Sequence, residues 1–422
     1  MRIDFKKYFK YSVLNNTFIS IFSTSFTALF NAAIGIIISI FIARSLGVEG
    51  LGELAVILTF SSLILTSGAI IYGGFEILIG RDEKLFIFLL FLLLSFLVIE
   101  ALFIIGLLQN SNLEYFKEVL HSHNVYYFFI FITIFGTLSD GIRRILNGRQ
   151  HFQYINFSEL LPIVIYAICI FSYFSKNLIN IESIIFSMFI AACSRSLIYI
   201  SFSIYLNLNN FKFTIKSWAP LREIFFLGIK NLFVGAPSYI PKILLLQLSN
   251  IFGNYQVGLF KIGLMAYEVS LIIPGAAANV LRGKAVSNSG SWSRSMNIGL
   301  LIFSVYLIGA LIFYLIGDFL LLFIFGNDFL EAKKYVIYFI IIGAFASFYY
   351  ILESEIVGRA SYPLRMIVYG NIFFLIAIFG NNFIVKNFAS SPLDIFPFLI
   401  CIYFIWLIIY LRAQRFYKSL IK

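Results

Sequence analysis

The sequence is poor in charge. Only 12% of its 422 residues are Asp, Glu, Lys or Arg, roughly half the share in an average soluble protein. Hydrophobic residues make up 61%, more apolar surface than a single water-soluble core can hide. This composition excludes a cytosolic enzyme, a secreted domain and a nucleic-acid-binding module, and we expect no nucleic acid among its partners.

Cysteine and histidine are equally scarce, with three of each. Cys169, Cys193 and Cys401 all lie in apolar runs, so they do not form a disulfide framework. The three histidines are too scattered for a metal site, and no Walker-type nucleotide motif occurs. We therefore expect no catalytic residues, no metal and no cofactor.

Long apolar runs are abundant instead. About 20 apolar residues at a rise of 1.5 Å cross the hydrocarbon layer of a membrane. The sequence predicts an all-α polytopic membrane protein with twelve transmembrane helices, at residues 17–43, 51–79, 85–109, 125–147, 154–175, 183–207, 224–251, 256–281, 296–325, 335–357, 364–385 and 394–411.

The distribution of Lys and Arg predicts the orientation of these helices. With the N-terminus inside, 21 of the 31 basic residues fall in inner segments, six in outer segments and four within spans. Cytoplasmic loops carry such an excess of positive charge. Because the number of spans is even, both termini are predicted to be cytoplasmic.

The chain also repeats itself. An apolar-Gly-x-x-x-apolar-Gly-x-apolar pattern at Gly47 recurs at Gly253, an offset of 206 residues, and a Gly-Arg pair after the fourth span recurs after the tenth. The alternative is that glycines recur wherever helices turn. We expect two six-helix lobes, at 1–210 and 211–422, that are parallel repeats around a central cavity. Such repeats are typical of transporters, with the substrate site between the halves.

Arg44–Gly52 (RSLGVEGLG) and Leu146–Arg149 (LNGR) resemble the corresponding segments of the polysaccharide transporters, the Wzx-like O-antigen flippases. These belong to the multidrug/oligosaccharidyl-lipid/polysaccharide exporter superfamily. The resemblance implies a V-shaped fold of six plus six helices that works by alternating access. It implies a cargo of undecaprenyl-pyrophosphate-type lipid-linked oligosaccharide, moved to the outer leaflet of the bacterial cytoplasmic (inner) membrane for surface polysaccharide biosynthesis. A glycan polymerase and a chain-length regulator are the implied partners.

Lys242 is the sharpest candidate for a substrate-binding residue. It follows Pro237 and Pro241, which should break the helix, and the N-terminus of a resumed half-helix attracts anions. Arg195 lies about 13 residues into its span, where a charge is costly unless it faces water or a partner. We predict that both cations bind the pyrophosphate. The alternative for Lys242 is a structural ion pair with Glu268.

Four further charged residues lie within predicted spans. Lys230 and Lys261 are further candidates for the anion site. Lys230 is close enough to the inner end of its helix to snorkel instead, and Lys261 shares a helix face with Glu268 and can neutralise it. Glu268 and Glu100 are candidates for coupling or gating by H⁺ or Na⁺. Each can equally be a structural carboxyl.

Two polar groupings allow structural interpretations. Asp140, Arg143 and Arg144 have i, i+3 and i+4 spacing near the inner end of the fourth span, and we interpret them as structural and topological. The first span carries a polar stripe that suits a cavity wall or holds helices together, formed by Ser20, Ser23, Thr24, Ser25, Thr27 and Asn31.

Two other functions stay open. A cation-coupled multidrug antiporter of the same superfamily would favour acids over bases within its spans, and the midplane charges here lean towards cations. A membrane-embedded glycan polymerase would be an enzyme with a sizeable outer loop and paired acids, and the predicted loops are short. The sequence therefore favours a transporter that is not an enzyme.

Overall fold

The computed structural model describes residues 5–82, 85–108, 120, 125–149, 151–207, 219–234, 236–275, 277–278, 281, 292–358 and 364–420. Within these ranges every regular element is helical. An all-helical architecture satisfies each backbone polar group within its own segment, which the hydrocarbon layer demands. The predicted fold class is confirmed.

Long helices account for nearly all of the described chain. The first half supplies α1 (Phe5–Tyr72), α2 (Phe75–Arg81), α3 (Phe86–Leu108), α5 (Tyr126–Gly148), α6 (Phe152–Ser175) and α7 (Ile181–Asn207). The second half supplies α8 (Ala219–Val234), α9 (Ala236–Ser270), α11 (Trp292–Ile324), α12 (Lys333–Gly358), α13 (Leu364–Asn387) and α14 (Phe396–Leu420), with the short 3-10 helices η3 (Asn327–Ala332) and η4 (Pro392–Ile395).

Helices α1 and α9 each bend sharply at a glycine. Gly47 has a φ of 69° and Gly253 a φ of 76°, a left-handed conformation that favours glycine. Eight helical stretches of the described chain are long and apolar enough to cross a membrane, and two of them contain these bends. Together with α5 and α13, they accommodate the twelve predicted spans of a multi-pass membrane protein.

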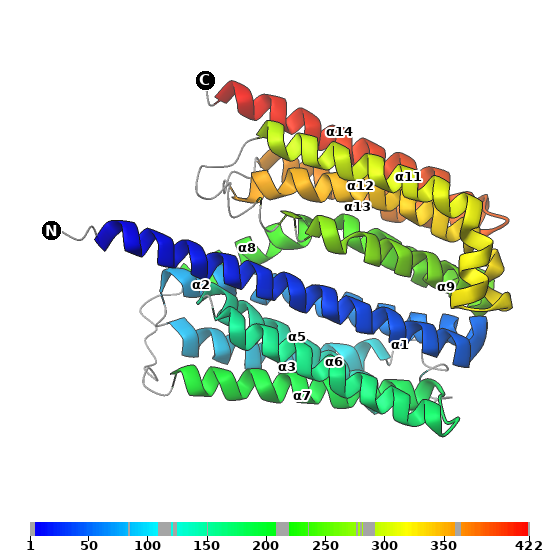
Figure 1. Ribbon diagram of the computed structural model, residues 1–422, viewed down its shortest axis with the longest axis horizontal. Coiled ribbons are helices and arrows are strands. Elements are labelled where there is room, and N and C mark those ends of the chain that lie inside the picture. Colours follow the sequence, from blue (N-terminus) through cyan, green and yellow to red (C-terminus); the bar gives the residue numbers. More distant parts are fainter. Residues whose placement is uncertain are drawn as a thin grey trace.

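The helices form one elongated bundle (Figure 1). Helices α1 and α9 pack against each other in its middle. Helices α5, α6 and α7 lie on the side of α1, and α11 to α14 on the side of α9 (Figure 1). Helix α1 begins and α14 ends at the same end of the bundle. The predicted boundary at residue 210 lies outside the described residues, so the division into two lobes stays a prediction.

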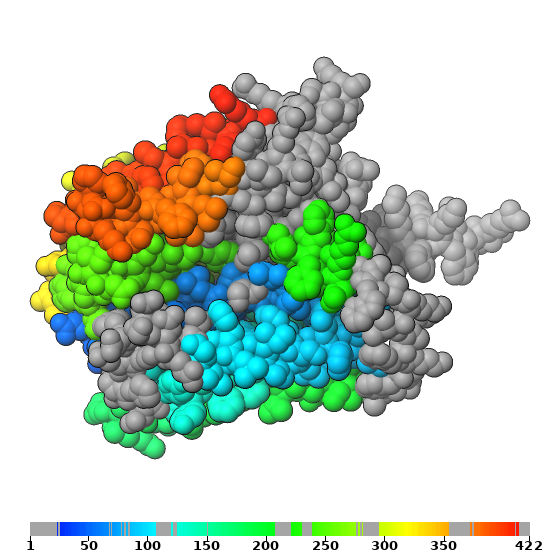
Figure 2. Space-filling view, turned by 180° about the vertical axis from the view of Figure 1, so that it is seen from behind, coloured from blue at the N-terminus to red at the C-terminus, as the bar shows by residue number. Residues whose placement is uncertain are grey.

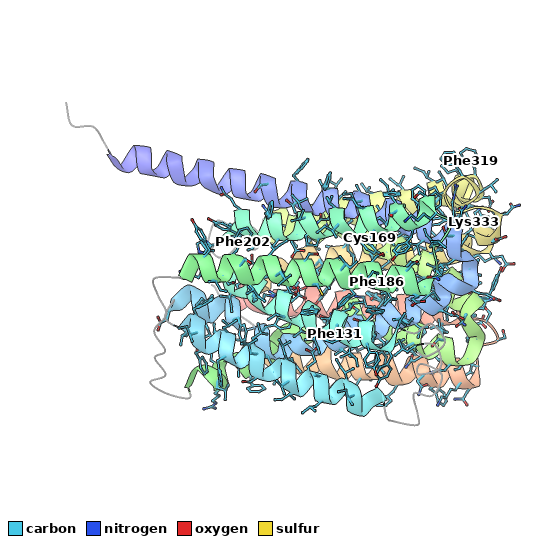
Figure 3. All side chains as sticks on the ribbon, turned by 90° about the horizontal axis from the view of Figure 1, so that it is seen from below. Phe131, Cys169, Phe186, Phe202, Phe319 and Lys333 are labelled. Atoms are coloured by element: carbon cyan, nitrogen blue, oxygen red, sulfur yellow. The ribbon has the colours of Figure 1, made fainter. Side chains whose placement is uncertain are left out.

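Large apolar side chains cover the outside of the bundle (Figure 3, where Phe319 and Lys333 mark one end). Leu315 and Phe323 of α11, for example, are 70% and 73% exposed. Apolar surface on this scale marks contact with lipid or another apolar partner, which fits a bundle embedded in a membrane.

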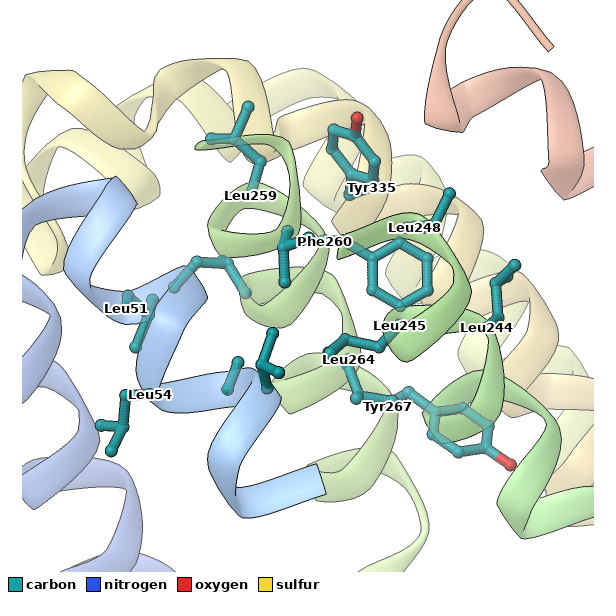
Figure 4. Close-up of a cluster of buried hydrophobic side chains, with 14 of the residues drawn as sticks. Leu51, Leu54, Leu244, Leu245, Leu248, Leu259, Phe260, Leu264, Tyr267 and Tyr335 are labelled. Atoms are coloured by element: carbon teal, nitrogen blue, oxygen red, sulfur yellow. The ribbon is translucent and has the colours of Figure 1, made fainter. Parts of the chain in front are cut away.

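One buried hydrophobic cluster joins the two halves of the chain. Leu51 and Leu54 of α1 belong to it together with Leu259 and Phe260 of α9 (Figure 4). The Phe260 ring also meets the Phe339 ring of α12 edge to face, at 4.9 Å between centroids. The core therefore runs through the contact between α1 and α9, next to both bends.

Candidate functional site

The two bends meet in a contact that only glycine permits. A Cβ on Gly52 would overlap the carbonyl oxygen of Asn254, and a Cβ on Gly258 would overlap that of Val48. These two contacts are copies of each other, because both pairs of equivalent positions differ by 206 residues. The Asn254 amide also donates to Glu53 Oε1 at 3.1 Å. We name residues 48–53 and 254–258 the outer seam, after the predicted orientation.

Arg44 holds the two halves together beside the outer seam. Its guanidinium donates to the carbonyl oxygen of Ile324 at 2.8 Å and to that of Phe323. Both acceptors belong to the last turn of α11, where carbonyl groups lack helical partners. A cation is favourable at that end of a helix, so Arg44 ties the first half to the second.

A second contact between the halves lies at the other end of α1. A Cβ on Gly228 of α8 would overlap the carbonyl oxygen of Ile70, and one on Gly74 would lie 3.1 Å from Ile224 Cα. We name residues 70–74 and 224–228 the inner seam. Figure 2 shows α8, in green, lying between the two groups of helices.

The predicted helix break concerns the two prolines before Lys242, Pro237 and Pro241. Helix α8 ends at Val234 and α9 begins at Ala236, with residue 235 outside the described part of the chain. Pro241 is accommodated within α9. Pro241 thus does not break the helix as predicted, and Lys242 lies about two turns into α9 rather than at its N-terminus. An interruption at residue 235 stays a prediction.

Lys242 reaches across from one half of the chain to the other. Its Nζ donates to Ser62 Oγ of α1 at 2.9 Å, and the pair is partly buried. Ser62 is about 15 Å along the helix from Gly52 of the outer seam and about 12 Å from Ile70 of the inner seam. Lys242 thus places a cation between the two seams.

Two further polar pairs accompany the contact between Lys242 and Ser62. Tyr239 shares a hydrogen bond with Thr66, one turn of each helix away from the Lys242 contact. Lys261 pairs with Glu268 at 3.4 Å, and both charges act on Lys242. Glu268 therefore pairs with Lys261, as their shared helix face suggested, while Lys242 binds Ser62.

Arg195 lies in a charge network inside the first half. Its Nη2 donates to Glu159 Oε1 at 2.6 Å and to Asp140 Oδ1 at 3.3 Å. Arg143 lies 3.7 Å from the same Glu159 oxygen, and Tyr199 donates to it at 2.7 Å. These contacts join α5, α6 and α7. The role of Arg195 in anion binding stays a prediction, and its engagement with two carboxylates counts against it.

This network predicts a stability effect for Arg195. We expect Arg195→Met to cost about 1–3 kcal/mol of folding free energy, because it leaves two carboxylates facing one guanidinium. The unfolding temperature in detergent measures the loss, with Arg412→Met, an exposed site on α14, as the control. An apolar pair, Arg195→Met with Glu159→Leu, should recover most of it. An unchanged unfolding temperature in Arg195→Met would contradict a structural role.

Glu100 and Lys230 are the remaining predicted site residues. Glu100 is 3% exposed and accepts a hydrogen bond from Thr137 at 2.7 Å, between α3 and α5. Its Oε2 has no hydrogen-bond partner within the described residues. Lys230 belongs to α8, but its side chain is outside the described part of the structure.

Polar residues of the first span hold α1 to α6. Asn156 donates to Ser23 Oγ at 3.1 Å, and Asn31 donates to the carbonyl oxygen of Glu159 at 3.5 Å. For these two members of the stripe, helix packing is the observed role. Sequence analysis missed Ser62 and Glu159. The sequence did carry a signal for Glu159. It is an acidic residue in a predicted span, 154–175, that contains no basic residue, so its charge needs a partner on another helix.

No protein-family model and no curated protein matches the sequence. Solved structures do match the fold. A multidrug resistance MATE family transporter of the MOP superfamily, in an inward-facing conformation, has a TM-score of 0.65 at 12% identity over 94% of this chain and 98% of that one. The MATE multidrug transporter DinF-BH gives 0.65 at 15%, over 94% of both chains. Lipid II flippase MurJ, in an inward closed conformation, gives 0.56 at 14%, over 94% and 99%.

Identities this low establish the fold alone. The chain has the fold of transporters in the MOP superfamily, which agrees with the predicted all-α polytopic fold. The narrower resemblance to Wzx-like flippases stays a prediction.

Proposed function

We propose that this chain is a membrane transporter that moves polyprenyl-pyrophosphate-linked oligosaccharide from the inner to the outer leaflet of the bacterial cytoplasmic membrane. One observation carries the proposal: Lys242 extends from the second half to Ser62 of the first, between the outer and inner seams. A site between two repeats is where alternating-access transporters hold their substrate. A cation there selects for an anionic cargo.

The chemistry of a pyrophosphate suits such a site. Phosphate oxygens form charge-assisted hydrogen bonds with ammonium and guanidinium groups, and these are stronger than neutral ones. A cell interior at negative potential also favours outward movement of an anion, by about 2.3 kcal/mol per charge per 100 mV. Transport then requires the outer and inner seams to open in turn.

Other predicted features belong to the same proposal. Lys261, whose charge acts on Lys242 and which pairs with Glu268, is a second cation for the headgroup, and Lys230 and Arg195 are further candidates. Coupling to H⁺ or Na⁺ at Glu268 or Glu100 would return the empty carrier. The cytoplasmic location of both termini, and the glycan polymerase and chain-length regulator as partners, are expectations from the sequence.

A cation-coupled multidrug antiporter is the second candidate. Two of the structural neighbours are multidrug transporters, and Glu268 offers a carboxylate with 43% of its side chain exposed. A carboxylate is the group that a cationic substrate needs.

Reconstitution into vesicles separates these functions. We expect the purified protein to move a fluorescent polyprenyl-pyrophosphate oligosaccharide between leaflets, measured by protection from a membrane-impermeant quencher, and to leave a cationic dye in place. Dye movement without lipid movement would support the antiporter. Longer glycan chains on the lipid after incubation would support a polymerase. Either outcome overturns the proposal.

A further inference from the structure

A second cation borders the inner seam. Arg144, in the last turns of α5, places Nη1 at 3.1 Å from Glu76 Oε2 of α2. One turn later, Gly148 packs so closely on Glu76 that a Cβ there would overlap its carbonyl oxygen. The two helices are therefore held in register by backbone contact as well as by the ion pair.

The backbone places this ion pair next to the second half of the chain. Glu76 follows Gly74 by two residues, and Gly74 contacts Ile224 of α8 in the inner seam. The Arg144 charge also acts on Tyr239 of α9, one turn before Lys242. Arg144 thus lies on the inner side of the Lys242 contact, where the two halves meet.

The ion pair is open to exchange. The side chains of Arg144 and Glu76 are 34% and 42% exposed, and ion pairs with this exposure contribute little to stability. The Nε of Arg144 has no hydrogen-bond partner among the described residues. A guanidinium binds phosphate through a planar fork of N–H groups, so a phosphate can replace the single carboxylate contact and use more donors.

We propose that Arg144 is a further substrate-binding residue, which receives the pyrophosphate at the inner seam by exchanging Glu76 for a phosphate before the headgroup reaches Lys242. This inference rests on the proposed function. It assigns Glu76 as a displaceable counter-ion, whereas the spacing of Arg144 with Asp140 had suggested a structural role.

The pair offers a test that separates binding from structure. Farnesyl pyrophosphate is the probe, and its affinity for the purified full chain is measured by calorimetry. We expect Arg144→Gln to weaken binding at least about tenfold and Arg144→Lys by less, because lysine keeps the charge and loses the fork. Glu76→Gln removes the competing carboxylate, so its affinity should equal or exceed that of the wild type. Arg412→Gln, exposed on α14, is the matched control.

A purely structural ion pair gives a different pattern. Arg144→Gln and Glu76→Gln would then weaken binding equally and lower the unfolding temperature equally, which overturns the inference. Wild-type affinity in Arg144→Gln overturns it as well. If the wild type binds farnesyl pyrophosphate no better than farnesol, the proposed function itself fails. If Arg144→Gln does not fold, Arg144→Lys against Glu76→Gln gives the same comparison.

Discussion

Alanine at both Gly52 and Gly258 is expected to hold the outer seam open and abolish most translocation. Each new Cβ would overlap a carbonyl oxygen of the opposite half, and a backbone atom cannot turn aside as a flexible side chain can. Overpacking typically costs about 1–3 kcal/mol at each site. Two sites therefore shift the equilibrium by roughly 30-fold to 10⁴-fold towards conformations in which the seam has parted.

Labelling from outside measures this shift. The three native cysteines, Cys169, Cys193 and Cys401, are first replaced. Ser62→Cys then introduces a single cysteine between the outer and inner seams. We expect a membrane-impermeant maleimide added outside to label it much faster in the double-alanine variant, while vesicle translocation falls.

The matched controls are Gly35 and Gly309, also on long helices, where a Cβ would meet no atom within 4 Å. Alanine at these positions should change labelling and translocation by no more than about twofold. Labelling and transport at wild-type levels in the Gly52→Ala, Gly258→Ala variant would show that the outer seam is not a gate.

The outer seam shows why much of the fold could be predicted from the sequence. Gly47 and Gly253 revealed the repeat because a positive φ leaves almost no choice of residue. Gly52 and Gly258 belong to the same pattern because two backbones touch there. The spans themselves were predictable because hydrocarbon tolerates only long apolar helices. A structural feature that only one residue type can satisfy can therefore be predicted from a single sequence.

The partners of the charged residues could not be predicted from the sequence in this way. Counting residues gives the depth of Arg195, but the sequence does not tell which neighbouring helix its side chain faces. Its partners Glu159 and Asp140 come from two other helices, 36 and 55 residues away. Lys242 finds Ser62 at a separation of 180 residues. Only the packing of the helices brings these groups together.

Lys242→Gln is expected to weaken binding of a polyprenyl pyrophosphate by about 10-fold to 150-fold, because a hydrogen bond to a charged group contributes about 1.5–3 kcal/mol. Glutamine keeps a polar group on a slightly shorter side chain and removes the charge. The affinity should therefore also depend less on salt, since one screened attraction is lost. Titration of the purified protein at low and high ionic strength measures both effects.

Two further variants separate the charge from its present partner. Lys242→Arg should retain most of the affinity, because it keeps the cation, and Ser62→Ala should change affinity by less than about threefold, because the headgroup replaces the hydroxyl as the partner of Lys242. Lys176→Gln, an exposed position after α6, controls for the net charge of the protein. If Lys242→Gln binds as tightly as the wild type at both salt concentrations, the anion site is not at Lys242. A loss in Ser62→Ala as large as in Lys242→Gln would instead make the contact between the halves, rather than the charge, the feature that matters.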